Sequence, residues 1–418
     1  MSIIEINSQF RKYAFIALGF LIPLTVAGIS ILMVLIFCSS ILDKTVYSRL
    51  KEILSNRVFV SILLFFLLHL AGLFWLDVTP VNGFKSWMVF IIPLLALSVD
   101  TNTARKGIYA FIVGMMIAEI GVYYNIFITW EQYLDGIYGP HLYLSGSRIS
   151  YNPKLAIAIA LILVTLLGGK YKGLRQTVTV LFLISMIVNM FMTGGRSGQV
   201  GFIMVWLVLS FYYLKNNTQG LYGMLIALVL ILFIAFNYSP IFQKRAIKAV
   251  SEFNSFQTTS SSTNDCIKLS DECRAISGSV QRRLHYNQHS LNLFKASPWI
   301  GYGTGSLENI WSNYVDNSKI FIFKITNPHS HHALILVQFG LIGFFIYLNI
   351  FYQQMKAAKL MPKNYEFKPI AILLPVFYVL INFYESYLWT HHTQALFAFL
   401  VSIIYRTDMY EKGPILDQ

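Results

Sequence analysis

The sequence predicts an all-α membrane protein with about twelve transmembrane helices and one large loop that contains short helices. Hydrophobic residues make up 56% of the 418 residues, charged residues make up only 12%, and the mean hydropathy is +0.58. A soluble domain carries about 25% charged residues. The apolar residues fall in runs that approach or exceed the roughly 20 residues a helix needs to cross a bilayer. These observations predict a polytopic membrane protein and exclude a soluble globular domain.

The apolar runs define the predicted spans. Residues 13–42 are too many for one untilted span, and Pro23 and Gly28 predict two short helices with a turn near 26–28. No small-residue cleavage site follows this run, which predicts a retained first span and not a cleaved signal peptide. The later spans are predicted at 58–76, at 84–99, from after Lys106 to about Phe127, at 154–169, at 176–193, up to about Leu214, up to about Tyr238, at 332–354, at 369–387 and at 391–405.

Lys and Arg concentrate in alternate links between the predicted spans. The positive-inside rule assigns such links to the cytoplasm, and about twelve spans then place both termini there. The net charge of +13 follows from these links, so it does not indicate a nucleic-acid partner. The basic links are 43–57, 105–106, 170–175, Lys215 and 356–368.

One large hydrophilic block divides the chain. Residues 1–238 contain predicted spans one to nine, and residues 239–331 form a loop with amphipathic helices. Residues 332–408 contain spans ten to twelve, and residues 409–418 form a polar cytoplasmic tail. The orientation set by the basic links places the loop on the outer side of the membrane.

The outer loop is basic, which suits an anionic ligand such as a phosphorylated lipid. The alternative is a solvated loop with a modest charge excess. The loop also contains Cys266 and Cys273, whose spacing permits a small disulfide in an oxidising compartment.

Arg196 lies in a Thr193-Gly-Gly-Arg-Ser-Gly198 turn between two predicted spans. Glycines let backbone N–H groups come close to a ligand, and an arginine at membrane depth is costly unless it is paired or functional. We interpret Arg196 as a binding residue. The alternative is a plain hairpin turn.

A second candidate segment begins at Arg282 and Arg283. It predicts an amphipathic helix on the protein or membrane surface. The segment ends in Ser297-Pro-Trp-Ile-Gly-Tyr-Gly-Thr-Gly305, a glycine-rich turn of a kind that can cradle phosphate. The apolar residues near helical spacing are Leu284, Leu291 and Phe294.

His329 stands where the polar loop meets the apolar run of the tenth span. Imidazole titrates near neutral pH, which suits general acid–base catalysis. The alternative is that His329 only caps the helix. A zinc site would pair His329 with His332, but no carboxylate or cysteine at ligand spacing completes it, so we predict no metal.

Two acids lie close to the span interiors. Glu385 is on the outer side near His391 and His392, and it is a further candidate for the site. Glu119 fits a packed, hydrogen-bonded acid within a span.

The candidate motifs also follow one another in a specific order. His329-Ser330, then nine residues, then Gly340-Leu-Ile-Gly343 resembles the histidine motif of the bacterial O-antigen ligase family. The segment from Arg283 to Gly305 resembles the family block just upstream, and the Arg196 turn resembles the arginine turn after the seventh span. Ser330 stands where many members have Asn. The order, the spacing and the layout of about twelve spans match along nearly the whole chain.

The resemblance implies a GT-C-like inverting glycosyltransferase of the bacterial inner membrane that needs no metal or other cofactor. Such an enzyme takes O-antigen glycan from undecaprenyl diphosphate and attaches it to a sugar hydroxyl of lipid A–core at the periplasmic face, in lipopolysaccharide assembly. His329 would accept the acceptor proton or orient a substrate. The implied diphosphate-binding residues are Arg196, Arg283 and Arg282, and the accessory candidates are Arg148, Ser330, His332 and Glu385.

Two alternatives remain open. An O-antigen polymerase would use the same donor and a second lipid-linked glycan as acceptor. A transporter of lipid-linked glycans would need charges distributed through the span interiors around a central cavity, whereas the candidate residues here collect at one face.

Overall fold

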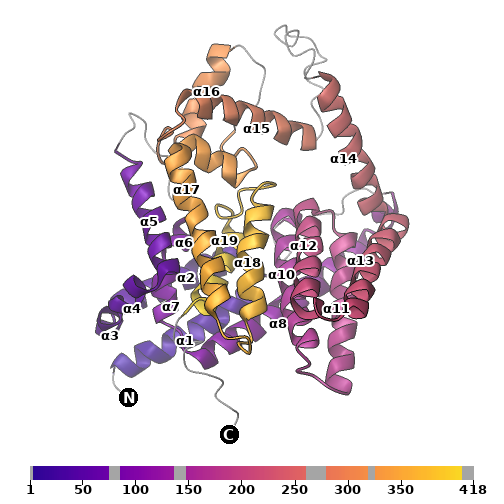
Figure 1. Ribbon diagram of the computed structural model, residues 1–418, viewed down its shortest axis with the longest axis horizontal. Coiled ribbons are helices and arrows are strands. Elements are labelled where there is room, and N and C mark those ends of the chain that lie inside the picture. Colours follow the sequence, from indigo (N-terminus) through magenta and orange to yellow (C-terminus); the bar gives the residue numbers. More distant parts are fainter. Residues whose placement is uncertain (1–2, 75–84, 136–146, 260–278, 319–324, 407–418) are drawn as a thin grey trace.

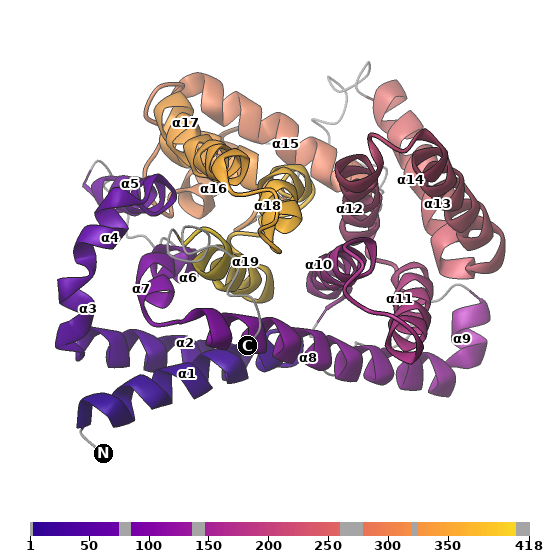
Figure 2. The same ribbon diagram turned by 60° about the horizontal axis from the view of Figure 1, so that its bottom comes forward.

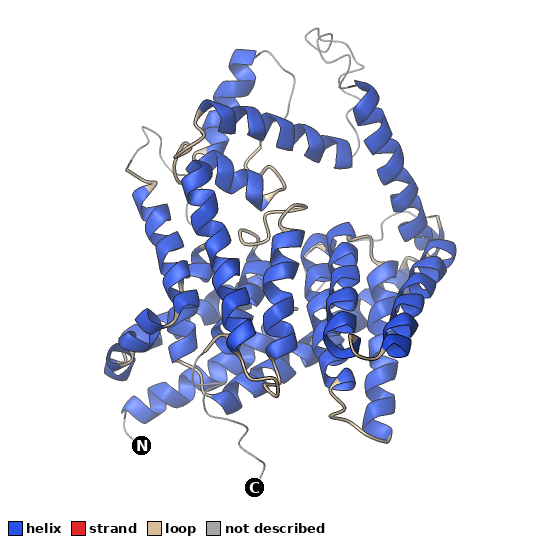
Figure 3. Ribbon diagram, viewed as in Figure 1, coloured by secondary structure: helices blue, strands red, loops and turns tan. Residues whose placement is uncertain are grey.

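A computed structural model describes residues 3–74, 85–135, 147–259, 279–318 and 325–406. Within these ranges the chain forms helices joined by loops and turns, without a strand (Figure 3). The predicted all-α fold is therefore confirmed. The Cys266–Cys273 pair and the tail at 409–418 lie outside the described residues.

The helices follow the apolar runs and extend into the large loop (Figure 1). In chain order they are α1 (Ile3–Leu21), α2 (Val26–Ile41), α3 (Lys44–Ser48), α4 (Leu50–Ser55), α5 (Arg57–Ala71), α6 (Trp87–Phe90), α7 (Ile92–Leu97), α8 (Thr101–Ile128), α9 (Trp130–Leu134), α10 (Arg148–Leu167), α11 (Leu174–Met192), α12 (Arg196–Leu214), α13 (Thr218–Tyr238), α14 (Pro240–Thr259), α15 (Ser279–Ala296), α16 (Leu307–Ser318), α17 (His331–Leu360), α18 (Lys368–Ile381) and α19 (His391–Ile404).

Six helices in the described part of the chain are long and apolar enough to cross a membrane: α8, α10, α11, α12, α13 and α17. Helix α2 and residues 46–55 would add a seventh span if the bent pair is counted as one. Helices α5, α18 and α19 are shorter apolar helices. The polytopic membrane protein is confirmed, and the count of about twelve spans stays a prediction.

The first apolar run is broken earlier than predicted. The break lies at residues 22–25, not near 26–28, and Gly28 lies inside α2. Pro23 is the physical reason, because proline has no N–H to continue the helical hydrogen bonds of α1.

The predicted single span at 84–99 is wrong. The segment forms the short helices α6 and α7, which meet at Ile91. Pro93 lies in the first turn of α7, where its missing N–H costs nothing, but the same residue cannot continue the hydrogen bonds of α6.

The basic links assigned to the cytoplasm come together at one end of the bundle. Glu366, between α17 and α18, accepts hydrogen bonds from Arg105 Nε at 2.7 Å and from Lys170 Nζ at 2.6 Å. At the same end Asn56 donates to the carbonyl of Tyr405 at 2.7 Å. Links far apart in the sequence thus share one face.

The large loop folds over the opposite end of the bundle. Helix α15 lies crosswise over the ends of α17 and α18, and α14 continues beyond the end of α13 on the same side (Figures 1 and 2). Helix α15 confirms the predicted amphipathic helix, but its buried face is not the predicted one. Tyr286, Ser290 and Leu293 are buried, whereas Leu291 is 47% exposed.

Helix α17 is interrupted at Gly340, which has φ +59° and ψ −157°. That conformation is essentially restricted to glycine. The glycine-rich turn after α15 docks into the interruption, because Gly301 has no Cβ to collide with the backbone of Val337 to Phe339. An added Cβ on Gly340 would meet the carbonyl carbon of Trp299 at 2.4 Å.

The docked turn satisfies backbone groups that the interruption of α17 leaves without helical partners. Such replacement is required wherever a helix is broken at membrane depth. The turn therefore joins α17 and is not a phosphate cradle. Its hydrogen bonds run from Tyr302 N to Val337 O at 3.0 Å, from Gly303 N to Gln338 O at 2.6 Å, from Leu341 N to Pro298 O at 2.8 Å and from Ile342 N to Trp299 O at 3.1 Å.

Gly340→Ala is expected to destabilise the protein by about 1–3 kcal/mol or more, because alanine is strained at this φ and ψ and its Cβ meets backbone. The melting temperature of the detergent-solubilised protein measures the effect. Gly223→Ala in α13 is the matched control, since a Cβ there meets no atom within 4 Å. Equal melting temperatures for the two variants would contradict the prediction.

Candidate active site

His329 and Glu385 form the centre of the candidate site. His329 Nδ1 lies 2.6 Å from Glu385 Oε2, and the His329 side chain is 38% exposed whereas that of Glu385 is only 6% exposed. Glu385 lies in the loop between α18 and α19, and His329 lies two residues before α17. The fold thus joins a partly accessible imidazole to a buried carboxylate across 56 residues of sequence.

A network of side chains fixes both members of this pair. Asn327 donates to Glu385 Oε1 at 2.7 Å and accepts from the backbone N–H of His329 at 3.0 Å. Ser386 donates from its hydroxyl to Asn327 at 2.7 Å and from its backbone N–H to Glu385 Oε1 at 3.1 Å. His329 itself has φ +55°, alone among the described non-glycine residues. Strained backbone of this kind persists where surrounding contacts hold it, and it clusters at functional sites.

The electrostatics of the pair follow from its neighbours. Burial raises the pKa of Glu385, but the hydrogen bond and charge of His329 and the charge of Arg283 outweigh burial, so the pKa lies below the ordinary value. Arg283 Nη2 is 3.5 Å from Glu385 Oε2. An ionised Glu385 accepts the Nδ1–H of His329, which leaves Nε2 of a neutral imidazole as the proton acceptor. The ring of Tyr286 stacks on His329 at 6.1 Å between centroids.

Arg196 is the first residue of α12, and its side chain points toward α14 and α15. It donates to the carbonyl of Arg245 at 3.0 Å and to the hydroxyl of Ser279 at 3.4 Å. The glycines of its turn allow close packing between α12 and α10. Gly195 and Gly198 pack against Asn152 of α10, where an added Cβ would lie 2.5 and 2.3 Å from side-chain atoms of Asn152.

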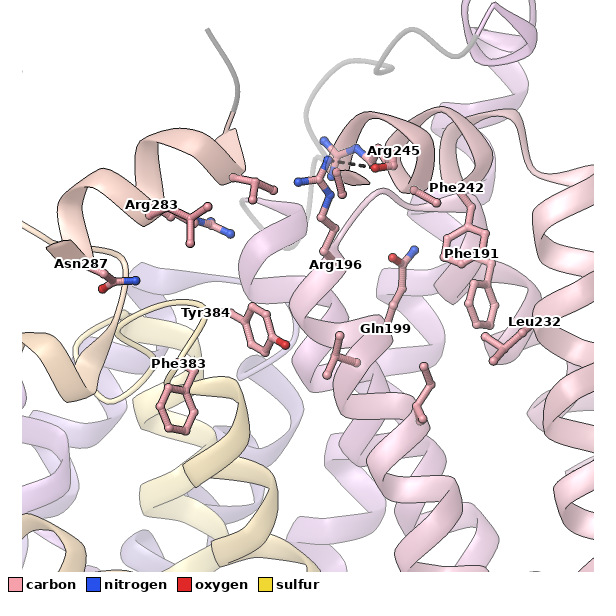
Figure 4. Close-up of a pocket in the computed structure, with 16 residues that line it drawn as sticks. Phe191, Arg196, Gln199, Leu232, Phe242, Arg245, Arg283, Asn287, Phe383 and Tyr384 are labelled. Atoms are coloured by element: carbon pink, nitrogen blue, oxygen red, sulfur yellow. Dashed lines mark hydrogen bonds between the residues drawn. The ribbon is translucent and has the colours of Figure 1, made fainter. Parts of the chain in front are cut away.

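A pocket of about 470 Å³ brings Arg196 and Arg283 together with a third arginine, Arg245 of α14. Figure 4 shows the three arginines at the upper rim of the pocket, with Asn287 and Tyr384 on one side and Phe191, Phe242 and Leu232 on the other. Sequence reasoning noted Arg245 only as one of many basic loop residues. Its place opposite Arg196 depends on α14, which we did not predict as a separate helix.

The three arginines concentrate positive charge. Burial and then the charge of Arg283 lower the pKa of Arg245 to about 10, although Glu252 acts in the opposite direction. Arg245 therefore stays charged at neutral pH. Arginine binds phosphate through paired, planar N–H groups, so this rim is suited to a diphosphate. The apolar side of the pocket is suited to a hydrocarbon chain.

The other residues predicted for the site lie around it in different ways. Arg282 is exposed and does not line the pocket. Arg148 begins α10, and its charge acts on Arg196. Ser330 is the N-cap of α17 and accepts the N–H of Ala333 at 3.4 Å. His332 is buried, and its Nε2 lies 2.9 Å from the carbonyl oxygen of Val379.

The histidines do not assemble into a metal site in the part of the chain that the structure describes. No group of three or more His, Cys, Asp or Glu side chains there lies close enough to hold an ion. His392, which we placed near Glu385, instead contacts the carbonyl of Ile22 and Lys154 Nζ at 2.9 and 3.2 Å. Lys154 is buried in α10.

Residues 181–348 match the family model described as O-antigen ligase. The matched segment contains Arg196, Arg245, Arg283 and His329, whereas Glu385 lies beyond it. No curated protein matches the chain.

Proposed function

We propose that the chain, whose residues 181–348 match the O-antigen ligase family model, transfers O-antigen glycan from undecaprenyl diphosphate to a sugar hydroxyl of lipid A–core. The family assigns an O-antigen ligase or polymerase type of activity to a multi-pass inner-membrane protein. Beyond this activity, the proposal specifies lipid A–core as the acceptor, a GT-C-like fold with about twelve spans, cytoplasmic termini and catalysis at the periplasmic face.

The observation that carries the proposal is the position of Arg283. It lines the arginine pocket and also lies 3.5 Å from Glu385, the partner of His329. One side chain thus connects a site suited to a diphosphate with a site suited to accepting a proton. A glycosyl transfer from a lipid diphosphate requires these two sites to lie close enough together to act on one bound donor.

The proposed reaction is a single displacement. The acceptor hydroxyl oxygen attacks the anomeric carbon of the donor, and His329 Nε2 takes the hydroxyl proton. The bond from the anomeric carbon to the diphosphate oxygen breaks, and undecaprenyl diphosphate leaves with the bonding electron pair. Arg196, Arg245 and Arg283 stabilise the negative charge of that leaving group. Attack from the face opposite the leaving group inverts the anomeric configuration.

The test is transfer in a reconstituted system. Purified protein in lipid nanodiscs receives a defined undecaprenyl diphosphate-linked glycan and purified lipid A–core, and the mass of the core is measured. We expect the core to gain the glycan. Transfer only onto a second lipid-linked glycan would make the protein a polymerase, and movement of the donor across a vesicle membrane without transfer would make it a transporter.

Transfer is expected to persist in EDTA, because the three arginines supply the positive charge that a divalent cation would otherwise provide. The initial rate with and without EDTA measures this. A loss of activity in EDTA that one added metal restores would contradict the prediction.

A further inference from the structure

We infer that Asn287 of α15 binds the first sugar of the donor and contributes to the choice of that sugar. The inference rests on the proposed function, which leaves the polar side of the pocket without a role. Asn287 and Tyr384 line that side of the pocket (Figure 4).

The side-chain amide of Asn287 is not fully hydrogen-bonded within the protein. Its Oδ1 atom is buried and has no hydrogen-bond partner. Buried polar atoms are nearly always paired, and an unpaired one calls for a ligand or another explanation. A carbonyl oxygen accepts a hydrogen bond, so the partner of Asn287 must be an O–H or N–H group.

The order of side chains along the pocket identifies this partner. Phe191, Leu232 and Phe242 lie on one side of the arginines, and the polar groups of Asn287 and Tyr384 lie on the other, together with Phe383 (Figure 4). The donor has the same order, with a hydrocarbon chain, a diphosphate and then a sugar. With the diphosphate on the arginines and the chain on the apolar side, the first sugar lies against Asn287.

The position of Asn287 also fits the reacting atoms. Asn287 follows Arg283 by one helical turn, so the two side chains share a face of α15. Arg283 contacts the diphosphate in the proposed reaction, and Tyr286, beside Asn287, stacks on His329. A sugar on Asn287 therefore has its anomeric carbon between the leaving group and the base. The phenol ring of Tyr384 offers an apolar surface beside it.

The test compares Asn287→Leu with Gln288→Leu, which also replaces a side-chain amide by leucine but at an exposed position of α15. Donors carry either a 2-acetamido or a 2-hydroxyl sugar next to the diphosphate, and sugar-free undecaprenyl diphosphate serves as a competitive inhibitor. We expect Asn287→Leu to melt no lower than wild type, because the lost oxygen has no partner to leave unpaired. Asn287→Ala serves as a second variant if leucine does not fit.

We expect kcat/KM for the donor to fall about tenfold in Asn287→Leu, with inhibition by sugar-free undecaprenyl diphosphate unchanged. A loss confined to the acetamido donor assigns the contact to the amide N–H, and an equal loss for both donors assigns it to a hydroxyl. Activity equal to Gln288→Leu, or equally weakened binding of the sugar-free lipid, would overturn the inference. Absence of transfer by the wild type would instead reject the proposed function.

Discussion

His329→Ala is expected to lower the rate of transfer by about 10²–10⁴-fold, the usual contribution of a positioned general base. The substitution removes the imidazole that is paired with Glu385 in the described site. The His329 side chain is partly exposed and precedes α17, so its removal leaves the helix packing intact. Initial rates in the reconstituted transfer assay measure the effect.

Two further variants separate a proton-accepting role from a positioning role. Glu385→Gln keeps a carbonyl that can accept the Nδ1–H of His329 but removes the charge that stabilises imidazolium, so a smaller loss than in His329→Ala is expected. Because the pKa of Glu385 is lowered in the folded protein, its stabilising charge is present at neutral pH. That contribution is lost only as the pH falls through the lowered value. His391→Ala, at an exposed histidine of α19, is the control and should retain activity. Full transfer by His329→Ala would rule out the base.

The sequence predicted His329 and Glu385 as separate candidates but not that they form a pair. His329 is visible because a polar loop meets an apolar run there. Glu385 lies 56 residues later, and only the folding of the 382–390 loop onto the start of α17 brings its carboxylate to the imidazole. Charge patterning along the sequence gives no information on such a long-range pair.

The glycines illustrate a different limit. Glycine signals close approach, but the sequence does not say what approaches. The glycines at 195 and 198 pack against Asn152 of α10, and Gly301 packs against the backbone of α17. A glycine inside the apolar run of α17 was the available sign that the helix is interrupted there. Gly340 has a backbone conformation that an intact helix does not contain.

The arginine pocket distinguishes two adjacent arginines of α15. Arg283 lines the pocket and reaches Glu385, whereas Arg282, the adjacent residue on α15, is exposed and does not line it. Since the two residues share charge, size and helix, their substitutions differ in access to the pocket and in contact with Glu385. The sequence motif alone could not distinguish them.

Arg283→Lys and Arg196→Lys are each expected to lower kcat/KM for the lipid-linked donor by about 10²–10³-fold, comparable to the loss of one donor to a developing oxyanion. Lysine keeps the charge but lacks the planar pair of N–H groups that grips a phosphate. Arg196→Lys also weakens the hydrogen bond to the carbonyl of Arg245, so a melting temperature accompanies each rate. Arg282→Lys is the matched control and should stay close to wild type. Rates near wild type in Arg283→Lys and Arg196→Lys would mean that positive charge alone, and not the paired N–H contact of arginine, stabilises the diphosphate.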